Sequence, residues 1–292
     1  MMTAIARVWS VAVAELAGAL RSRRAIVLLL VFLLAALMMM HFNIETFEVF
    51  ERLMVEGLHL PKTGEVGAFA DTLWKSPLFV EKIRKFSVGN TLVFNEIFGR
   101  HPLELMYTWM IFTLAPMLTV LVSAGRIADD VHTGAVRYML LRVTRGEYVA
   151  GKFAGEALLL AAAYVLAMGG VLVMLALRLS PASALRLAPA FIDTLWRVWV
   201  QSLSWLGVAL CISQMMRSSG KATVLAILAF PVLLKGSCSR TIEALNVFFP
   251  CGVAGAFWRH APSAVCYGVF QQVTLAFVYL TLGLLVFRRR DV

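Results

Sequence analysis

Residues 126–152 read RIADDVHTGAVRYMLLRVTRGEYVAGK, a polar segment that is flanked on each side by a long apolar run. The preceding run covers residues 105–125, and the following run covers residues 153–177. A helix needs about 20 apolar residues to cross the hydrocarbon core of a bilayer. The polar segment is therefore predicted to be an elbow that joins two transmembrane helices.

The composition of the whole chain is typical of a membrane protein. Of its 292 residues, 60% are hydrophobic and 15% are charged, whereas soluble domains carry about a quarter charged residues. The apolar residues occur in long blocks, which argues against a water-soluble enzyme. A net charge of +10 is expected when cytoplasmic loops of a membrane protein are rich in Lys and Arg. We therefore predict no nucleic-acid partner.

The apolar blocks predict an all-α integral membrane protein with six transmembrane helices. The predicted spans are residues 25–42, 105–125, 153–177, 196–216, 220–235 and 263–287. The fifth span is short and contains Pro231, so we expect it to bend or to stop partway across. Gly151 and Gly155, near the start of the third span, form a small-xxx-small step that permits close helix packing. The first span follows a basic flank as in a signal peptide, but it lacks a small-residue cleavage site and is expected to be retained.

Residues 3–21 have the pattern of an amphipathic helix. One face is apolar and carries Ile5, Val8, Trp9, Ala12, Leu16 and Leu20. This pattern favours an interfacial helix that lies along the membrane surface. The alternative is a simple helical continuation of the first span.

The distribution of basic residues predicts the orientation. Lys and Arg outnumber acidic residues in the short segments that share a side with the N-terminus, namely Arg7, Arg21, Arg23, Arg24, Arg126, Arg137, Arg142, Arg145, Lys152, Arg217, Lys221, Arg288, Arg289 and Arg290. Such segments are usually cytoplasmic. We predict a multi-pass protein of a bacterial inner (cytoplasmic) membrane with both termini in the cytoplasm.

Two outer segments are too long for simple connections. Residues 43–104 are predicted to form a mostly helical extracytoplasmic subdomain whose first part extends the first span. Residues 236–262 are rich in Gly, Pro and aromatic residues and are predicted to form a re-entrant segment before the last span. Cys238 and Cys251 lie in this second segment, where they form either a disulfide in an oxidising periplasm or two small apolar positions.

Candidate catalytic, nucleotide and metal sites are weak in this sequence. GEYVAGKF, residues 146–153, has the glycines and Lys152 of a phosphate-binding loop but Phe153 where a hydroxyl is needed, and no strand precedes it. The five histidines do not pair at metal-ligand spacing. Glu156 follows Lys152 by one helical turn and is expected to pair with it, with a proton-relay role as the alternative. We therefore predict a non-catalytic protein without a bound cofactor or metal.

The elbow itself is predicted to contain one short amphipathic helix. Asp129 and Asp130 stand near its start, where acids favour the helix dipole, and Arg142 and Arg145 stand near its end. Such a helix can dock into a soluble partner and pass movement to both adjoining spans. An ordinary solvated loop, held inside by its arginines, fits the composition equally well.

With this elbow, the sequence resembles the ABC-2-type permeases, the membrane subunits of one class of ABC exporter. The residues that fit the family pattern are Asp130, Gly134, Met139, Leu140, Arg145, Gly151 and Lys152. Ala135 replaces the usual Thr and Val143 replaces the usual Pro. The N-terminal surface helix, the six spans, the re-entrant segment and the basic end RRRDV also fit, so the resemblance covers residues 1–292 as a single permease domain.

The resemblance implies a subunit that couples ATP hydrolysis in a partner to export. It implies cytoplasmic ATP-binding subunits, which would bind the ATP, and a second permease copy or a paralogue. Contact with the ATPase is expected at Asp129, Asp130, Thr133, Gly134, Arg142 and Arg145. The candidate translocation path is formed by Gln201, Ser204, Gln214, Gln271 and Gln272, which fit lipid-like or amphiphilic cargo without selecting one.

Two alternatives remain open. The chain could be a mechanical or scaffold subunit that acts on a periplasmic protein through residues 43–104 and transports no solute. It could also be an ion-coupled secondary transporter, which the lack of paired charges within the spans disfavours.

Overall fold

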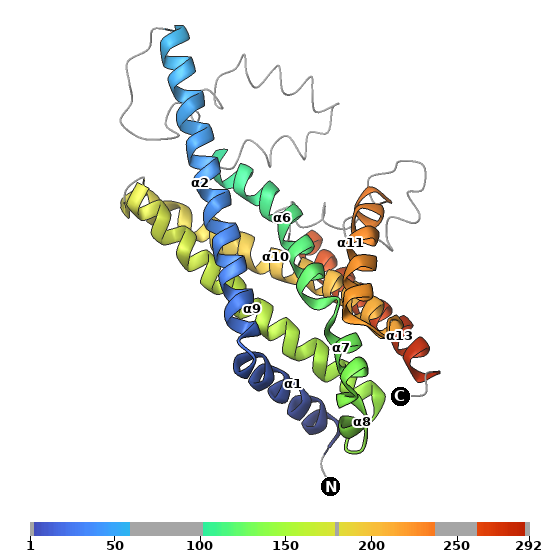
Figure 1. Ribbon diagram of the computed structural model, residues 1–292. Helices are drawn as coiled ribbons and strands as arrows, with labels where there is room; N and C mark the ends of the chain where they lie inside the picture. Colours follow the sequence, from blue (N-terminus) through green and yellow to red (C-terminus); the bar gives the residue numbers. More distant parts are fainter. Residues whose placement is uncertain (1–2, 59–101, 179–180, 237–261, 290–292) are drawn as a thin grey trace.

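The structure is a computed structural model, and it describes residues 3–58, 102–178, 181–236 and 262–289. Every regular element within these ranges is an α-helix (Figure 1). The helices are α1 (Ala4–Arg21), α2 (Arg24–Leu58), α6 (Pro102–Ser123), α7 (Arg126–Thr133), α8 (Ala135–Leu140), α9 (Arg145–Arg178), α10 (Pro181–Met215), α11 (Ser219–Gly236) and α13 (Pro262–Arg288). The predicted all-α class is confirmed.

Five helical stretches in the described part of the chain are long and apolar enough to cross a membrane. They are Ala25–Val49, Leu103–Thr133, Arg145–Arg178, Leu185–Met215 and Val265–Arg288. The predicted fifth span corresponds to a shorter apolar helix, Ser219–Leu233. The chain is thus a multi-pass membrane protein, and the count of six spans stays a prediction.

The two predicted outer segments are described only in part. Residues 43–58 continue α2 without a break, which confirms that the first span extends as a helix. Residues 59–101 and 237–261 lie outside the described residues. The rest of the subdomain, the re-entrant segment and the pair Cys238 and Cys251 therefore stay predictions.

Helix α10 lies at the centre of the bundle. It packs against α13, α9 and α6 and also contacts α11 and α7, and Trp205 in its second half is fully buried. The helix begins at Pro181, well before the predicted start of the fourth span at residue 196. Phe191 explains the difference, because it is fully buried and packs on Tyr107 of α6 with ring centroids 5.0 Å apart.

Hydroxyl groups link the central helices within the apolar core. Tyr164 Oη of α9 lies 2.6 Å from Ser202 Oγ of α10 and 3.4 Å from Thr119 Oγ1 of α6. Thr108 of α6 and Thr194 of α10 form a second link of 3.2 Å. Such interhelical hydrogen bonds stabilise packing where the hydrophobic effect between helices is weak, as it is inside a bilayer.

Helix α1 packs closely across the start of α9 (Figure 1). A Cβ at Gly151 would lie 2.5 Å from Val11 Cβ and 2.9 Å from the carbonyl oxygen of Val8. A Cβ at Gly155 would lie 3.0 Å from Glu15 Cβ. Glycine is therefore required at Gly151, and the predicted small-xxx-small step is where the N-terminal helix docks.

The predicted amphipathic helix at the N-terminus is confirmed as α1, but its apolar residues divide between two faces. Val11, Ala12 and Ala19 are buried on the side that packs. Ile5 and Trp9, by contrast, are 82% and 57% exposed. An exposed apolar face beside a docked face suits a helix at the membrane surface.

Candidate functional site: an elbow braced by ion pairs

The elbow between α6 and α9 contains two short helices in place of the single helix that was predicted. Helix α7 ends at Gly134, whose φ of 75° lies in the left-handed region that favours glycine. Helix α8 then runs to Leu140, and α9 begins at Arg145. The prediction of one continuous helix was wrong because the Thr133–Gly134 pair was treated as part of the helix, whereas Gly134 terminates it.

The start of α7 is capped from another helix. Ser213 Oγ of α10 accepts hydrogen bonds from the backbone N–H groups of Ile127 and Ala128, at 2.9 and 3.0 Å. These are amides that no intrahelical carbonyl can satisfy. Asp129 contributes its charge to this first turn, while the hydrogen-bonding cap comes from Ser213.

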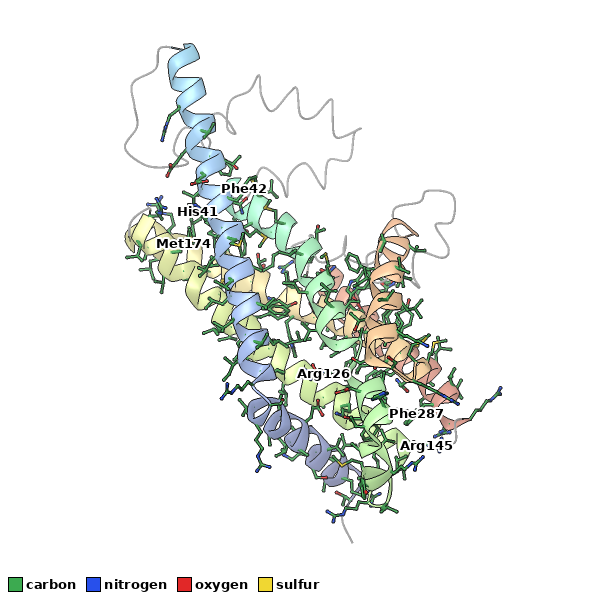
Figure 2. The ribbon with its side chains drawn as sticks, viewed as in Figure 1. His41, Phe42, Arg126, Arg145, Met174 and Phe287 are labelled. Carbon is green, nitrogen blue, oxygen red and sulfur yellow. The ribbon has the colours of Figure 1, made fainter. Side chains whose placement is uncertain are left out.

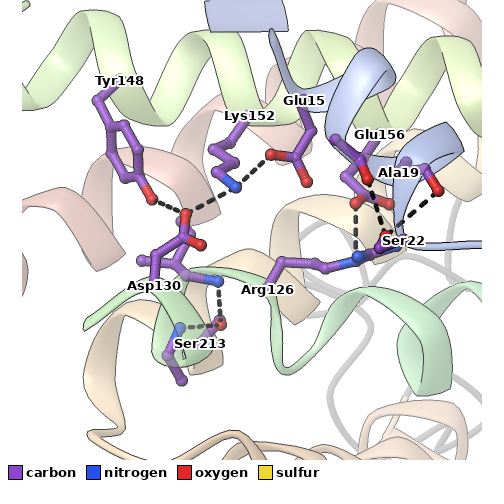
Figure 3. Close-up of polar contacts among 12 residues, drawn as sticks. Glu15, Ala19, Ser22, Arg126, Asp130, Tyr148, Lys152, Glu156 and Ser213 are labelled. Atoms are coloured by element: carbon purple, nitrogen blue, oxygen red, sulfur yellow. Dashed lines mark hydrogen bonds and ion pairs between the residues drawn. The ribbon is translucent and has the colours of Figure 1, made fainter. Parts of the chain in front are cut away.

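A buried lysine joins three helices at the base of the elbow (Figure 3). Lys152 Nζ of α9 forms ion pairs with Glu15 of α1 and with Asp130 of α7, the second at 2.7 Å. Tyr148 of α9 donates a hydrogen bond to the same Asp130 carboxylate. The lysine side chain is only 6% exposed, so charges from α1 and α7 satisfy it in place of water.

A second buried ion pair lies beside the first (Figure 3). Arg126 Nε at the start of α7 is 2.8 Å from Glu156 Oε1 of α9, and the two side chains are 8% and 0% exposed. The prediction that Glu156 pairs with Lys152 was therefore wrong. Lys152 pairs instead with Glu15 of α1 and Asp130 of α7. Residue spacing along one helix cannot predict partners that lie on other helices.

The N-terminus of α9 is a capping box that also binds α1. The backbone N–H of Thr144 donates to Glu147 Oε2 at 2.9 Å, and the N–H of Glu147 donates to Thr144 Oγ1 at 3.3 Å. Arg7 of α1 pairs with Glu147 Oε1 at 2.6 Å. The Arg7 guanidinium, together with the Thr144 N–H, lowers the pKa of the Glu147 carboxyl to about 2. Glu147 is therefore an anion at physiological pH.

Arg145 connects the elbow to the C-terminal end of α13. Its Nη1 donates to the carbonyl oxygens of Phe287 and Arg288 at 2.6 and 2.8 Å, and its guanidinium lies 5.5 Å from the Phe287 ring. A cation at the last carbonyls of a helix satisfies acceptors and favours the dipole. Figure 2 shows Arg126, Arg145 and Phe287 at one end of the bundle, opposite His41 and Met174. Both described ends of the chain lie at the elbow end.

The tip of the elbow is exposed, in contrast to its base. We use the name elbow tip for α8 and the turn after it, residues 135–142. Tyr138 is 77% exposed and Leu141 is 83% exposed. Arg137 and Arg142 are exposed beside them. The tip thus combines two large apolar side chains with positive charge.

The six residues predicted to contact an ATPase occupy four different environments. Thr133 and Arg142 are exposed, and Gly134 is half-buried at the helix break. Asp129 lines a cavity between helices. Asp130 and Arg145 bind other parts of this chain, as described above.

The residues of the candidate translocation path lie mostly inside the subunit. Gln201, Ser204, Gln214 and Gln272 are each at most 1% exposed, and Gln271 is half-buried. Ser204 donates to the carbonyl oxygen of Gln201, and Gln214 Nε2 donates to that of Leu210. These side chains stand on α10 and α13, which pack against each other, so their role in transport stays a prediction.

Several residues of the site were not singled out from the sequence. The Thr144-x-x-Glu147 spacing of a capping box was a readable signal for the start of α9. Glu15, Arg126 and Tyr148 gave no local signal, because their partners are distant in sequence. The near match to a phosphate-binding loop belongs to the first turns of α9, where Lys152 is paired with carboxylates.

Comparison with known families agrees with this architecture. The sequence model described as ABC-2 family transporter protein matches residues 9–237. The chain belongs to this family. It is thus a membrane permease of an ABC transporter, and such permeases are typically non-catalytic and generally work with ABC ATP-binding subunits. No match was found among curated proteins.

Proposed function

We propose that this permease exports its substrate and that its elbow tip is the surface on which a cytoplasmic ATP-binding subunit pushes. The observation that carries the proposal is the exposure of Tyr138 and Leu141 at the end of the bundle. Tyrosine and arginine are enriched among the residues that contribute most to protein interfaces, and Leu141 adds exposed apolar surface beside Tyr138 and the arginines. Arg142 and Thr133 would contact the same partner at the rim.

The base of the elbow would transmit the movement. Lys152 and the Arg126–Glu156 pair tie α7 to α9 and α1, and Arg145 ties the start of α9 to α13. Buried ion pairs resist separation, because breaking one leaves an unpaired charge out of water. A push on the tip would therefore move these helices together. Asp130 and Arg145 then act as positioning residues, and the partner contact falls to the tip.

The orientation and assembly are part of the same proposal. Both described chain ends and the basic elbow lie at one end of the bundle, which would face the cytoplasm of a bacterial inner membrane. A second copy or a paralogue would complete the translocation path. The polar side chains of α10 that were predicted to line this path are buried within a single subunit. The ATP-binding subunits would supply the nucleotide site.

A second candidate function is a mechanical subunit that acts on a periplasmic protein. Helix α2 is 35 residues long, about 50 Å at 1.5 Å per residue, whereas the hydrocarbon core is about 30 Å thick. Its last turns, which contain Glu45 and Glu48, would extend beyond the bilayer. Deletion of residues 59–101 separates the two functions. An exporter should keep ATP-driven export after the deletion, whereas a mechanical subunit should lose its periplasmic partner and should show no export before or after it.

The test of the main proposal is a pair of matched variants. Leu141→Glu places a charge in the elbow tip, whereas Leu177→Glu changes a residue that is 81% exposed at the opposite end of α9. We expect Leu141→Glu to reduce co-purification of the ATP-binding subunit about tenfold or more, because an unpaired charge in a contact that excludes water costs roughly 1–3 kcal/mol or more. Leu177→Glu should retain the partner.

Thermal stability should be unchanged in both variants, since neither side chain packs inside the subunit. Membrane insertion is measured for both, because residue 177 stands at the end of a predicted span. Equal retention of the ATP-binding subunit by Leu141→Glu and the unmodified protein would contradict the proposal.

A further inference from the structure

The surface helix α1 and the long helix α2 are joined by only two residues, Ser22 and Arg23 (Figure 1). Ser22 ends α1, and its N–H donates to the carbonyl oxygen of Gly18 at 3.0 Å. The carbonyl oxygen of Arg23 accepts a hydrogen bond from the N–H of Val27 in the first turn of α2, at 3.1 Å. The backbone of Arg23 is thus held by both helices.

Arg23 has a backbone conformation that is unfavourable for its residue type. Its φ is 56°, and no other residue except glycine has a positive φ in the described part of the chain. The left-handed region brings a Cβ close to a carbonyl oxygen, so helices that end in this conformation usually have glycine there. The chain does use glycine between α7 and α8, where Gly134 has a φ of 75°. An arginine at residue 23 therefore lowers stability relative to glycine, which points to a role for its side chain.

That side chain is not used inside the subunit. Arg23 is exposed, and its guanidinium forms no hydrogen bond or ion pair with the described residues. Arg21, at the end of α1, is exposed in the same way. Each guanidinium has five N–H donors in a fixed fork that fits a phosphate group. The turn therefore presents two cations to a partner outside the subunit.

Exposed apolar side chains flank the turn on both helices. Leu20 at the end of α1 is 62% exposed, and Ile26 and Leu30 at the start of α2 are 51% and 49% exposed. Apolar residues that face outward from a spanning helix contact acyl chains, and basic residues at the end of such a helix extend to the lipid headgroups. Arg21 and Arg23 therefore lie at the level of the headgroups.

Two more cations lie across an open cavity from this turn. Ser22 and Ser219, the first residue of α11, line the same cavity. Arg217 and Lys221 stand two residues before and two residues after Ser219, and both are exposed. Asp129 lines the cavity as well, but it interacts within the chain and is not part of this surface. We use the name basic rim for the exposed cations around the cavity: Arg21, Arg23, Arg217 and Lys221.

We propose that the basic rim binds the phosphate of an anionic phospholipid, such as phosphatidylglycerol, in the leaflet at the elbow end. Arg23 makes the central contact, Arg21 contacts the same headgroup, and the cations of α11 approach it from the other side. The bound lipid thus joins the α1–α2 turn to α11. This binding accounts for an arginine at a left-handed position, because the contact with lipid offsets the unfavourable backbone.

The charge of the basic rim selects the type of headgroup. Each basic residue near an anionic membrane surface strengthens binding about fivefold. A phosphatidylcholine headgroup carries its own cation beside the phosphate, so it gains less from a cluster of arginines. An anionic lipid should therefore bind more tightly than a zwitterionic one with the same acyl chains.

The test uses two measurements that change in opposite directions at one residue. Arg23→Gly removes the side chain and relieves the left-handed backbone. In a neutral detergent without lipid, its unfolding midpoint should rise by roughly 2–4 °C. Its affinity for phosphatidylglycerol, measured by native mass spectrometry on the delipidated full-length protein, should fall about fivefold. A purely structural role of Arg23 would not produce this combination.

Three controls accompany this variant. Arg23→Lys keeps both the charge and the left-handed backbone, so it should retain the midpoint and most of the affinity. Arg178→Gln removes an exposed arginine at the opposite end of the bundle and should leave phosphatidylglycerol binding unchanged. Phosphatidylcholine with the same acyl chains should bind more weakly to the unmodified protein, and Arg23→Gly should reduce this difference.

The proposal has clear contrary outcomes. Unchanged affinity for phosphatidylglycerol in Arg23→Gly, or equal binding of the two lipids by the unmodified protein, would overturn it. A loss in Arg178→Gln as large as that in Arg23→Gly would show that any exposed arginine has this effect, and would also overturn it. So would a lowered unfolding midpoint in Arg23→Gly, because Arg23 would then support the fold itself.

Discussion

The base and the tip of the elbow differ in almost every physical respect, although fewer than ten residues separate them. The base holds charges that are paired between α1, α7 and α9 and removed from water. The tip holds apolar side chains that are almost fully exposed. A rigid base with an exposed apolar tip is the arrangement expected of a lever, because force applied to the tip is transmitted only if the base does not yield. The difference predicts that changes at the base lower stability, while changes at the tip affect partner binding alone.

The largest effect is expected at Lys152. Lys152→Met leaves the Glu15 and Asp130 carboxylates without their shared cation, and removing one partner of a buried ion pair costs about 3 kcal/mol or more. The midpoint of thermal unfolding in detergent should fall by roughly 10 °C, since 1 kcal/mol corresponds to about 2–4 °C in a chain of this size. Lys221→Met, at an exposed lysine of α11, is the control and should leave the midpoint unchanged. A similar midpoint for both variants would show that the base is not a brace.

The next effect is expected where α1 docks on α9. Gly151→Ala introduces a Cβ that lies within 2.9 Å of a backbone oxygen of α1, and overpacking of this kind costs about 1–3 kcal/mol. The matched control is Gly169→Ala in the same helix, where a Cβ meets no atom within 4 Å. That substitution should be neutral or stabilising, by up to about 1 kcal/mol. Thermal unfolding of the two variants separates the steric effect from helix propensity, and a stable Gly151→Ala protein would contradict the docking of α1.

A smaller effect is expected at Arg145. Arg145→Gln weakens two hydrogen bonds to the last carbonyls of α13, worth about 1 kcal/mol in a partly exposed setting. Arg142→Gln, at an exposed arginine of the tip, should leave stability unchanged but weaken binding of the ATP-binding subunit. Arg145→Gln should thus lower the unfolding midpoint, and Arg142→Gln should lower co-purification of the ATP-binding subunit. If both variants changed the same quantity in the same way, the distinction between base and tip would be lost.

The smallest effect is expected at the Arg7–Glu147 pair, and it depends on pH. The pKa of Glu147 is about 2 in the folded chain against an ordinary value of 4.5. Because the folded pKa is lowered, the contribution of this carboxylate is fully present above pH 4.5 and is lost as the pH falls toward 2. The unmodified protein should therefore lose stability as the pH falls from 4.5 toward 2, and Arg7→Gln should lose less over the same range. Unfolding midpoints measured from pH 6 to pH 3 test this, and identical profiles for the two proteins would contradict it.

The sequence was sufficient for those parts of the fold that depend on one segment alone. Long apolar runs predicted the all-α class, and the apolar periodicity of residues 3–21 predicted α1. The glycine step at Gly151 and Gly155 correctly indicated a close contact, although the partner helix was not identified. Such features are encoded by neighbouring residues, so they can be read without knowledge of the tertiary structure.

The site was predicted less well, because its contacts join residues that are far apart in the chain. Glu156 was assigned to Lys152 from a spacing of four residues, whereas a cation on α7 lies closer to its carboxylate. The capping of α7 by Ser213 depends on how α10 crosses the elbow. The break at Gly134 was encoded locally and was missed, since the elbow was predicted as one helix from Asp129 and Asp130 to Arg142 and Arg145.

The most direct test of the lever is a crosslink from the elbow tip in the assembled transporter. A photo-crosslinking residue is introduced at position 141 and, as the control, at position 177, and each protein is irradiated in native membranes with and without ATP. The account predicts an adduct with the ATP-binding subunit from position 141 alone, with a yield that changes when ATP is added. An adduct with that subunit from position 177, or none from position 141, would contradict it.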